Sequence, residues 1–159
     1  MSYKVDKFSL FSSEDNPSAQ EISTTYTEIT GSKCEVKSYN TNPKILYKFS
    51  FLISSLSFSD RSFYLHIKLQ KSNDNFSSNI VDIPNCMFNN SGDTHNASDN
   101  SFQTCTAMFI LENFDSKYLR LVSRSRSGSY QARLHTVTDY DDGTPSGIYY
   151  NPSLIVAEL

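Results

Sequence analysis

The 159-residue sequence contains no tryptophan, only five glycines, and no long run of apolar residues. A membrane-spanning helix needs about 20 mostly apolar residues, so the sequence predicts no membrane span. The N-terminal stretch lacks an apolar core, and we therefore expect no secretory signal. The formal net charge is −3. A mildly acidic chain has little overall attraction for nucleic acid or anionic membranes, so neither is an expected partner.

Cysteine is also scarce. Cys34, Cys86 and Cys105 are an odd number of thiols and include no CxxC pair, a pattern typical of neither a disulfide framework nor a zinc site. We expect three reduced thiols. A Cys86–Cys105 disulfide is the alternative if the chain meets an oxidising compartment.

Motifs for catalysis are missing as well. The sequence has no HExxH, GxSxG or Walker motif and no dinucleotide-binding glycine pattern. Its histidines are scattered, with His66 and His135 expected on outward strand faces and His95 in a loop. The sequence therefore predicts neither an enzyme nor a bound cofactor.

Aromatic residues are plentiful, with ten tyrosines and eleven phenylalanines, and such side chains favour a pleated, half-buried sheet. Apolar and polar residues alternate with a period of two, which indicates strands with one buried and one wetter face. The pattern predicts strands over residues 22–29, 33–39, 44–54, 62–71, 102–112, 117–126, 130–136 and 153–159. About eight strands and no convincing helix favour an all-β, antiparallel sandwich or barrel.

The remaining segments are polar. Residues 1–20 are interpreted as an arm or linker, either a frayed terminus or a tether, and residues 21–159 as one domain. Residues 72–101 and 138–147 are expected to be long loops, where recognition often resides. Gly128 is expected to close a hairpin between 117–126 and 130–136.

Two of the predicted strands, 102–112 and 153–159, are apolar on both faces. A two-layer sandwich covers one face of each sheet, so the other face needs a neighbouring subunit or flanking loops. The favoured explanation is an oligomer, with the following predicted interface residues: Met108, Phe109, Ile110, Leu154, Val156 and Leu159.

Two charged clusters are candidate sites. Arg120, Arg124 and Arg126 share one strand face, with Arg133 on the expected hairpin partner. Guanidinium groups there suit an anion or glycan, such as phosphate, a sulfated glycan or a carboxylate-rich protein, and the favoured alternative is a charged outer face that keeps an exposed sheet soluble. Asp139, Asp141 and Asp142 precede Gly143 and form a weak Ca²⁺ candidate. A solvated turn is the favoured interpretation of that second cluster, so we expect no metal.

From Lys44 onward the layout resembles the jelly roll of the C1q and tumour necrosis factor families. Three segments carry the resemblance: Tyr47-Lys48-Phe49-Ser50-Phe51, Tyr118-Leu119-Arg120-Leu121 and the final Ser153–Leu159. The chain is also similar to small virion proteins of marine bacteriophages, which carry such domains as head decorations or fibre tips. The resemblance implies a jelly-roll β-sandwich that forms a homotrimer, with its last strand near the three-fold axis.

These observations together lead us to expect a non-enzymatic structural protein of a virion, made in the host cytoplasm. It would be a trimeric capsid decoration or a fibre component, contacting other capsid or tail proteins or a host surface receptor. The alternative is a carbohydrate- or host-receptor-binding module that uses the loops 72–101 and 138–147.

Overall fold

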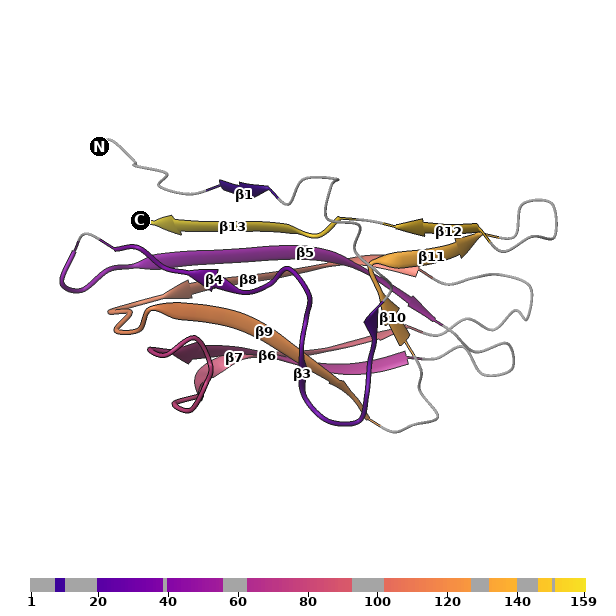
Figure 1. The fold of residues 1–159 in the computed structure, drawn as a ribbon, viewed down its shortest axis with the longest axis horizontal. Helices are drawn as coiled ribbons and strands as arrows, with labels where there is room; N and C mark the ends of the chain where they lie inside the picture. The colour runs from indigo at the N-terminus through magenta and orange to yellow at the C-terminus, as the bar shows by residue number, and fades with distance from the viewer. Residues whose placement is uncertain are drawn as a thin grey trace.

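A computed structural model describes residues 8–10, 20–38, 40–55, 63–92, 102–126, 132–139, 146–149 and 151–159. In these ranges the chain is all-β, without a helix. Two antiparallel sheets pack face to face as a β-sandwich, and a short separate hairpin extends from one end (Figure 1). The expected all-β, antiparallel sandwich is therefore confirmed.

The first sheet, sheet A, is built around the long strand β5 (Ile45–Ser55). One edge of β5 pairs with β8 (Phe102–Leu111) along its whole length. The other edge is shared by β13 (Ser153–Glu158) and β10 (Ala132–Leu134). The sheet is completed by β1 (Phe8–Leu10) beside β13 and β2 (Gln20–Glu21) beside β10.

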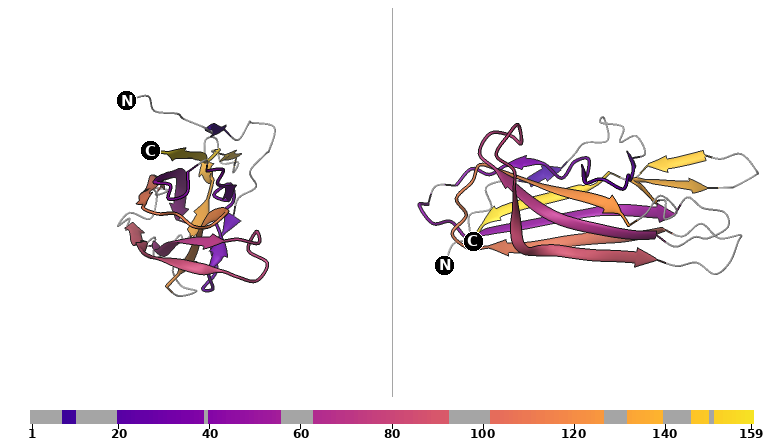
Figure 2. Two further views of the ribbon diagram at one scale, coloured as in Figure 1. Left: turned by 90° about the vertical axis from the view of Figure 1, so that its left-hand side faces the viewer. Right: turned by 90° about the horizontal axis from the view of Figure 1, so that it is seen from below.

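The second sheet, sheet B, has β6 (Phe63–Ser72) between β7 (Val81–Gly92) and β9 (Tyr118–Ser125). The far edge of β9 pairs with β3 (Thr27–Glu28) and β4 (Cys34–Glu35). The right-hand view of Figure 2 looks onto this sheet from below. The separate hairpin consists of β11 (Thr136–Asp139) and β12 (Ser146–Tyr149).

The core lies between the two sheets and follows the period of two in the sequence. Alternate side chains of β5, β6 and β9 point inward, and the largest fully buried ones come mostly from these strands: Ile45, Tyr47, Phe49, Ile53, Phe63, Leu65, Ile67, Leu69, Leu119 and Leu121. The strands predicted over 44–54, 62–71, 102–112, 117–126 and 153–159 are thus present to within two residues at each end. Burial of one face fixes their register because a one-residue slip would expose that face.

The prediction of a loop over residues 72–101 is wrong for β7. The sequence of this segment has only short apolar pairs, such as Met87-Phe88, and lacks a clear alternation. Its backbone nevertheless pairs with β6 as an antiparallel strand. The register shifts between Lys68 and Gln70, opposite Pro84 and Asn85, and Asn85 has a φ of 61°. An edge strand tolerates a proline and a bulge because its outer side has no partner strand to satisfy.

The two strands predicted over 22–29 and 33–39 shrink to the two-residue strands β3 and β4. The segment predicted as an arm contributes β1 and Gln20 of β2 to sheet A; residues 1–7 and 11–19 lie outside the described ranges. The hairpin predicted at Gly128 is also wrong, because β10 pairs with β5 and β2 in sheet A. Both edges of β9 are already occupied by β6, β3 and β4, which leaves no place for a further partner.

His135, predicted on an outward face, is fully buried. It lies between β10 and β11 and has a positive φ of 64°. Its backbone N–H donates to the backbone carbonyl of Leu52 at 3.0 Å, and its imidazole ring contacts the Phe51 ring edge-on. The adjoining segment, predicted as a loop over 138–147, contains the ends of β11 and β12; residues 140–145 lie outside the described ranges.

Ser32 replaces a missing strand partner on β9. Between β3 and β4 the chain turns at Gly31, whose φ is 82°. The hydroxyl of buried Ser32 accepts the N–H of Leu121 at 3.1 Å and donates to the same residue's carbonyl. The Ser32 carbonyl accepts the hydroxyl of Tyr47 from sheet A at 2.6 Å. One short turn therefore bonds to both layers of the sandwich.

Ser32→Ala is expected to lower the free energy of unfolding by about 1–3 kcal/mol, because the buried Leu121 N–H loses its acceptor. Urea unfolding followed by circular dichroism measures the change. Ser38→Ala is the matched control, since the Ser38 hydroxyl bonds at an exposed turn, and there we expect less than about 0.5 kcal/mol. Equal losses in the two variants would contradict the assigned role of Ser32.

Candidate functional site

The first candidate surface is the outer face of sheet A. Side chains opposite one another on paired strands share a face, and the register places Ile110, Leu46 and Ala157 in one row. The next row holds Met108, Lys48 and Ile155. Met108 is 62% exposed and Ile110 54% exposed. Three neighbouring strands thus share an apolar outer face, on which Leu46 and Ile155 are half-buried and Ala157 is buried. We call this face the sheet A patch: Leu46, Met108, Ile110, Ile155 and Ala157.

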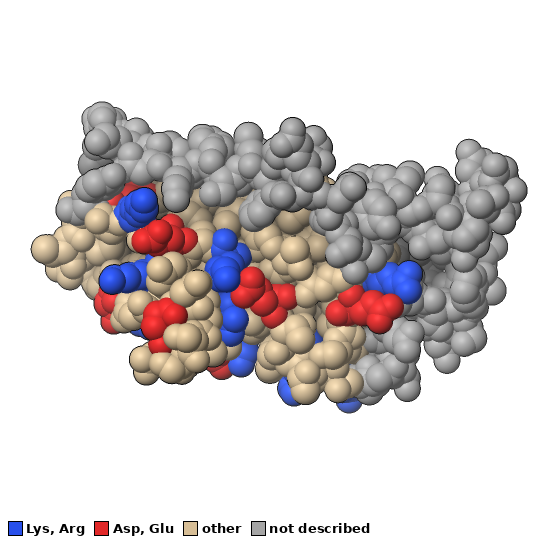
Figure 3. All heavy atoms as spheres, in the orientation of Figure 1, with Lys and Arg blue, Asp and Glu red and all other residues tan. Residues whose placement is uncertain are grey.

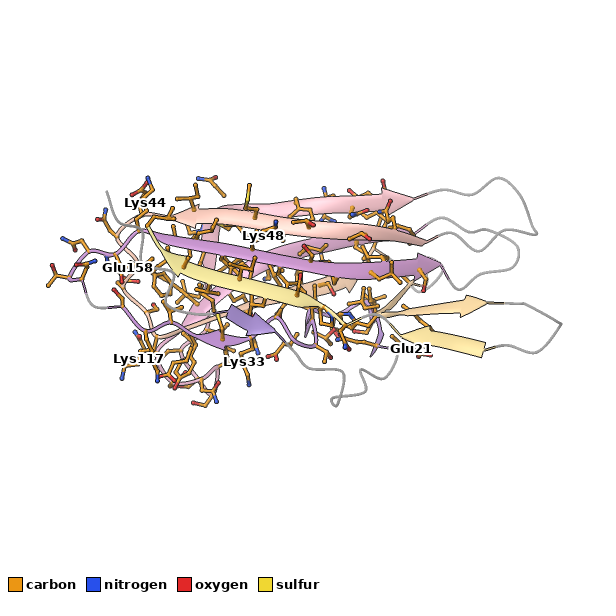
Figure 4. All side chains as sticks on the ribbon, turned by 90° about the horizontal axis from the view of Figure 1, so that it is seen from above. Glu21, Lys33, Lys44, Lys48, Lys117 and Glu158 are labelled. Atoms are coloured by element: carbon orange, nitrogen blue, oxygen red, sulfur yellow. The ribbon has the colours of Figure 1, made fainter. Side chains whose placement is uncertain are left out.

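Lys48 stands in the middle of the sheet A patch. Figure 4 looks down on this face and shows Lys48 over β5, between β8 and β13, while the labelled Lys44 and Glu158 lie nearer the left-hand end. Its stem lies between Met108 and Ile155 in the register. A long aliphatic stem with a charged tip can cover apolar surface while the ammonium stays in water.

The outer edge of β8 adds to this surface. In the described ranges β8 pairs with β5 alone, and its ten residues carry no charge. Beside its C-terminal end is a cavity of about 390 Å³ with an apolar part formed by Ile83, Pro84, Cys86, Ile110, Leu111 and Phe114. An uncharged, unpaired strand edge favours association with another chain.

The structure divides the six predicted interface residues. Leu154 is only 2% exposed and belongs to the core of its own chain, and Phe109 and Val156 are half-buried against that core. Met108, Ile110 and Leu159 are exposed. Leu154, Phe109 and Val156 point inward because their cross-strand partners are core residues. Leu154 is paired with Phe49, and both Val156 and Phe109 are paired with Tyr47.

The second candidate surface is the outer face of sheet B. Direct cross-strand partners place His66 beside Arg124 and Asn89. Tyr64 lies opposite Ser91, and the N–H of Arg126 donates to the Tyr64 carbonyl at 3.1 Å. These six side chains alternate between cations, rings and small polar groups. We call them the sheet B patch: Tyr64, His66, Asn89, Ser91, Arg124 and Arg126.

Rings and cations are in contact across the sheet B patch. The rings of Tyr64 and His66 meet edge-on with centroids 5.3 Å apart. The guanidinium of Arg126 lies 5.7 Å from the centre of the Tyr64 ring. Arg124 lies 4.8 Å from the centre of the Tyr26 ring, which also receives the Lys68 ammonium at 3.9 Å. Such cation–π contacts hold long side chains in place without neutralising them.

Charge is distributed unevenly along this face. Arg120 is bonded to Glu28 at 3.3 Å and to Gln70 at 3.0 Å, and Lys68 is bonded to Asp82 at 2.7 Å. Partial burial raises the pKa of Asp82, but hydrogen bonds from Lys68 and Gln70 outweigh that effect and hold the pKa below its ordinary value. Within the described ranges no carboxylate lies within ion-pair distance of Arg124 or Arg126.

The predicted cluster of four arginines is therefore wrong in part. Arg120, Arg124 and Arg126 share the outer face of sheet B, but Arg133 lies in β10 of sheet A and pairs with Glu21 at 3.2 Å. On the side of the molecule seen in Figure 3, Lys and Arg groups lie next to Asp and Glu groups among uncharged residues. The aromatic partners Tyr26 and Tyr64 were missed, although the alternation of residues 63–71 already placed Tyr64 and His66 outward.

The remaining sequence candidates add no site. Asp139 is the last residue of β11, and Asp141 and Asp142 lie outside the described ranges. The described residues include no group of His, Cys, Asp or Glu side chains that could hold a metal ion. None of the three cysteines, all of which lie in the described ranges, forms a disulfide. Burial raises the pKa of both Cys86 and Cys105, so these thiols stay protonated near neutral pH.

No protein-family model matches the chain, and no curated protein matches its sequence. No helix in the described ranges has the length and apolar character to cross a membrane. The candidate sites therefore rest on the two patches and their geometry.

Proposed function

We propose that this protein is a non-enzymatic structural component of a virus particle, which assembles with copies of itself through the outer face of sheet A. The observation that carries the proposal is the sheet A patch, where Met108 and Ile110 are more than half exposed on an uncharged strand. Apolar side chains gathered on adjacent strands are rare on a monomer surface and common at interfaces. The last strand, β13, contributes Ile155 and Ala157 to this face.

The proposed assembly is a homotrimer with a jelly-roll topology, as a capsid decoration or a fibre component. The path of the chain supports this topology, because β5 and β6 lie in different sheets, as do β7 and β8, and β8 and β9. Repeated crossing between two sheets is a feature of jelly rolls. Lys48, surrounded by apolar side chains, would limit the packing to one register because a misplaced ammonium is costly to bury.

The mass in solution tests the assembly. Light scattering on a sizing column is expected to give three times the mass of one chain, and Met108→Lys is expected to reduce it to the mass of one chain at micromolar concentration. Met87→Lys is the matched control, because Met87 is equally exposed on the outer face of sheet B, and it should leave the mass unchanged.

A single-chain mass for the unmodified protein at these concentrations would reject the assembly through sheet A. The virion role is tested separately, by peptide mass spectrometry of purified virus particles whose genome encodes this chain. Absence of this chain from intact particles would reject the virion role while leaving the oligomer intact.

A further inference from the structure

We propose that the sheet B patch is a binding site for an acidic glycan, one whose sugars carry uronate or sulfate groups. This goes beyond self-assembly and does not depend on it, because the patch lies on the sheet opposite to the one proposed to contact other copies. The juxtaposition that carries the inference is a pair of arginines with no carboxylate partner among the described residues, beside a ring pair and two small polar side chains.

Charge complementarity favours an anionic ligand. Arg124 and Arg126 are exposed and stand two residues apart on β9, so both point outward, roughly 7 Å apart along the strand. Their nearest cationic neighbours on this face, Arg120 and Lys68, are already paired with Glu28 and Asp82. The two free guanidinium groups can each form bidentate hydrogen bonds with a carboxylate or a sulfate.

The other four side chains suit a sugar. The Tyr64 and His66 rings, half-buried and in edge contact, offer flat apolar surface for the C–H face of a pyranose. Asn89 and Ser91 lie directly opposite these two residues on β7 and are exposed. An amide and a hydroxyl supply both donors and acceptors for sugar hydroxyls.

The sparse charge favours a glycan over nucleic acid. Affinity for nucleic acid comes largely from cations that neutralise several phosphates. This patch has two arginines without a carboxylate partner in the described ranges, on a chain with a net charge of −3. Two cations match a polymer whose acidic groups are separated by neutral sugar surface. The cation–π contacts with Tyr26 and Tyr64 hold both arginines over the sheet, which reduces the entropy lost on binding.

Calorimetric titration of the full chain tests the proposal with four probes: short oligogalacturonates, heparin oligosaccharides, neutral dextran oligosaccharides and single-stranded DNA. Binding is expected for one or both acidic glycans, and the stronger of the two identifies uronate or sulfate as the recognised group. Replacing both arginines in Arg124→Ala/Arg126→Ala should weaken it roughly 100-fold, since each charged hydrogen-bonding group lost costs about tenfold in affinity.

The control variant is Lys44→Ala/Arg133→Ala, which removes the same charge from partly exposed ion pairs away from the sheet B patch and should leave affinity within about twofold. Tyr64→Ala should weaken binding without changing its dependence on salt. No binding of either acidic glycan, equal binding of dextran, or tighter binding of DNA would each overturn the proposal. None of these results bears on the mass in solution, so a failed glycan site and a failed assembly are distinguishable.

Discussion

Leu154→Ala is expected to lower the free energy of unfolding by about 2–5 kcal/mol, which is the usual range for truncating a buried leucine. Leu154 lies in β13 opposite Phe49 and faces the core between the sheets. Its removal leaves a cavity that neighbouring strands cannot fill, because β5 is fixed by partners on both edges. Urea unfolding at one protein concentration measures the loss.

Met87→Ala is the control for Leu154→Ala, because Met87 is 60% exposed on the outer face of β7, and a change within about 0.5 kcal/mol is expected there. The comparison tests the assignment of faces in sheet A. If Leu154 instead contributed to contacts between copies, its truncation would reduce the mass in solution and leave the free energy of unfolding of the single chain nearly unchanged. That result would show that the assignment of Leu154 to the core is wrong.

The second large effect is expected on acidification. Burial away from water lowers the pKa of His135 from 6.5 to about 4, with the carbonyl of Thr30 opposing the shift. A folded-state pKa below the unfolded value means that stability is complete above about pH 6.5 and declines as pH falls towards 4. The lowered pKa of His135 therefore reduces the free energy of unfolding by about 2 kcal/mol between pH 7 and pH 5, and by about 3 kcal/mol between pH 7 and pH 4.

Urea midpoints measured between pH 7 and pH 5 test this loss, together with an NMR titration of the His135 ring. Carboxylates titrate at lower pH, and the lowered pKa values of Asp82 and Asp115 place their effect below the His135 window. His135→Asn should abolish the loss between pH 7 and pH 5, since asparagine also tolerates a positive φ. A His135 ring that titrates near pH 6.5 in the folded protein would refute the prediction.

The strands with strict alternation were predictable from the sequence, and those with weak patterns were not. Residues 44–54 and 62–71 place their apolar side chains at every second position, so their existence and their buried faces follow from local chemistry. Residues 81–92 have little such pattern, and β7 exists because the exposed backbone edge of β6 supplies hydrogen-bond partners. Backbone pairing of this kind leaves little trace in the side chains.

The candidate sites were predictable to a similar, partial extent. The sequence of β8 is apolar on both faces, so it did not separate the outward Met108 and Ile110 from the inward Phe109. The outward direction of Arg120, Arg124 and Arg126 followed from the alternation of β9. The partners of these side chains did not follow, because Glu28 and Tyr26 reach the arginines from a segment about 90 residues away in sequence. Local periodicity gives direction, whereas contacts depend on which strands become neighbours.

The amino-acid sequence by itself determined the all-β class, the central strands and the face that each buries, because side-chain period and burial are local properties. Only the tertiary structure decided that β10 joins β5 and not β9 and that His135 is buried. It also decided that Arg120 and Arg133 have carboxylate partners, whereas Arg124 and Arg126 have none in the described ranges. Each of these outcomes depends on which distant segments become neighbours in the fold, because a strand edge can pair with only one strand at a time and an arginine pairs with the carboxylate that lies nearest to it. That competition is settled by the packing of the whole sandwich.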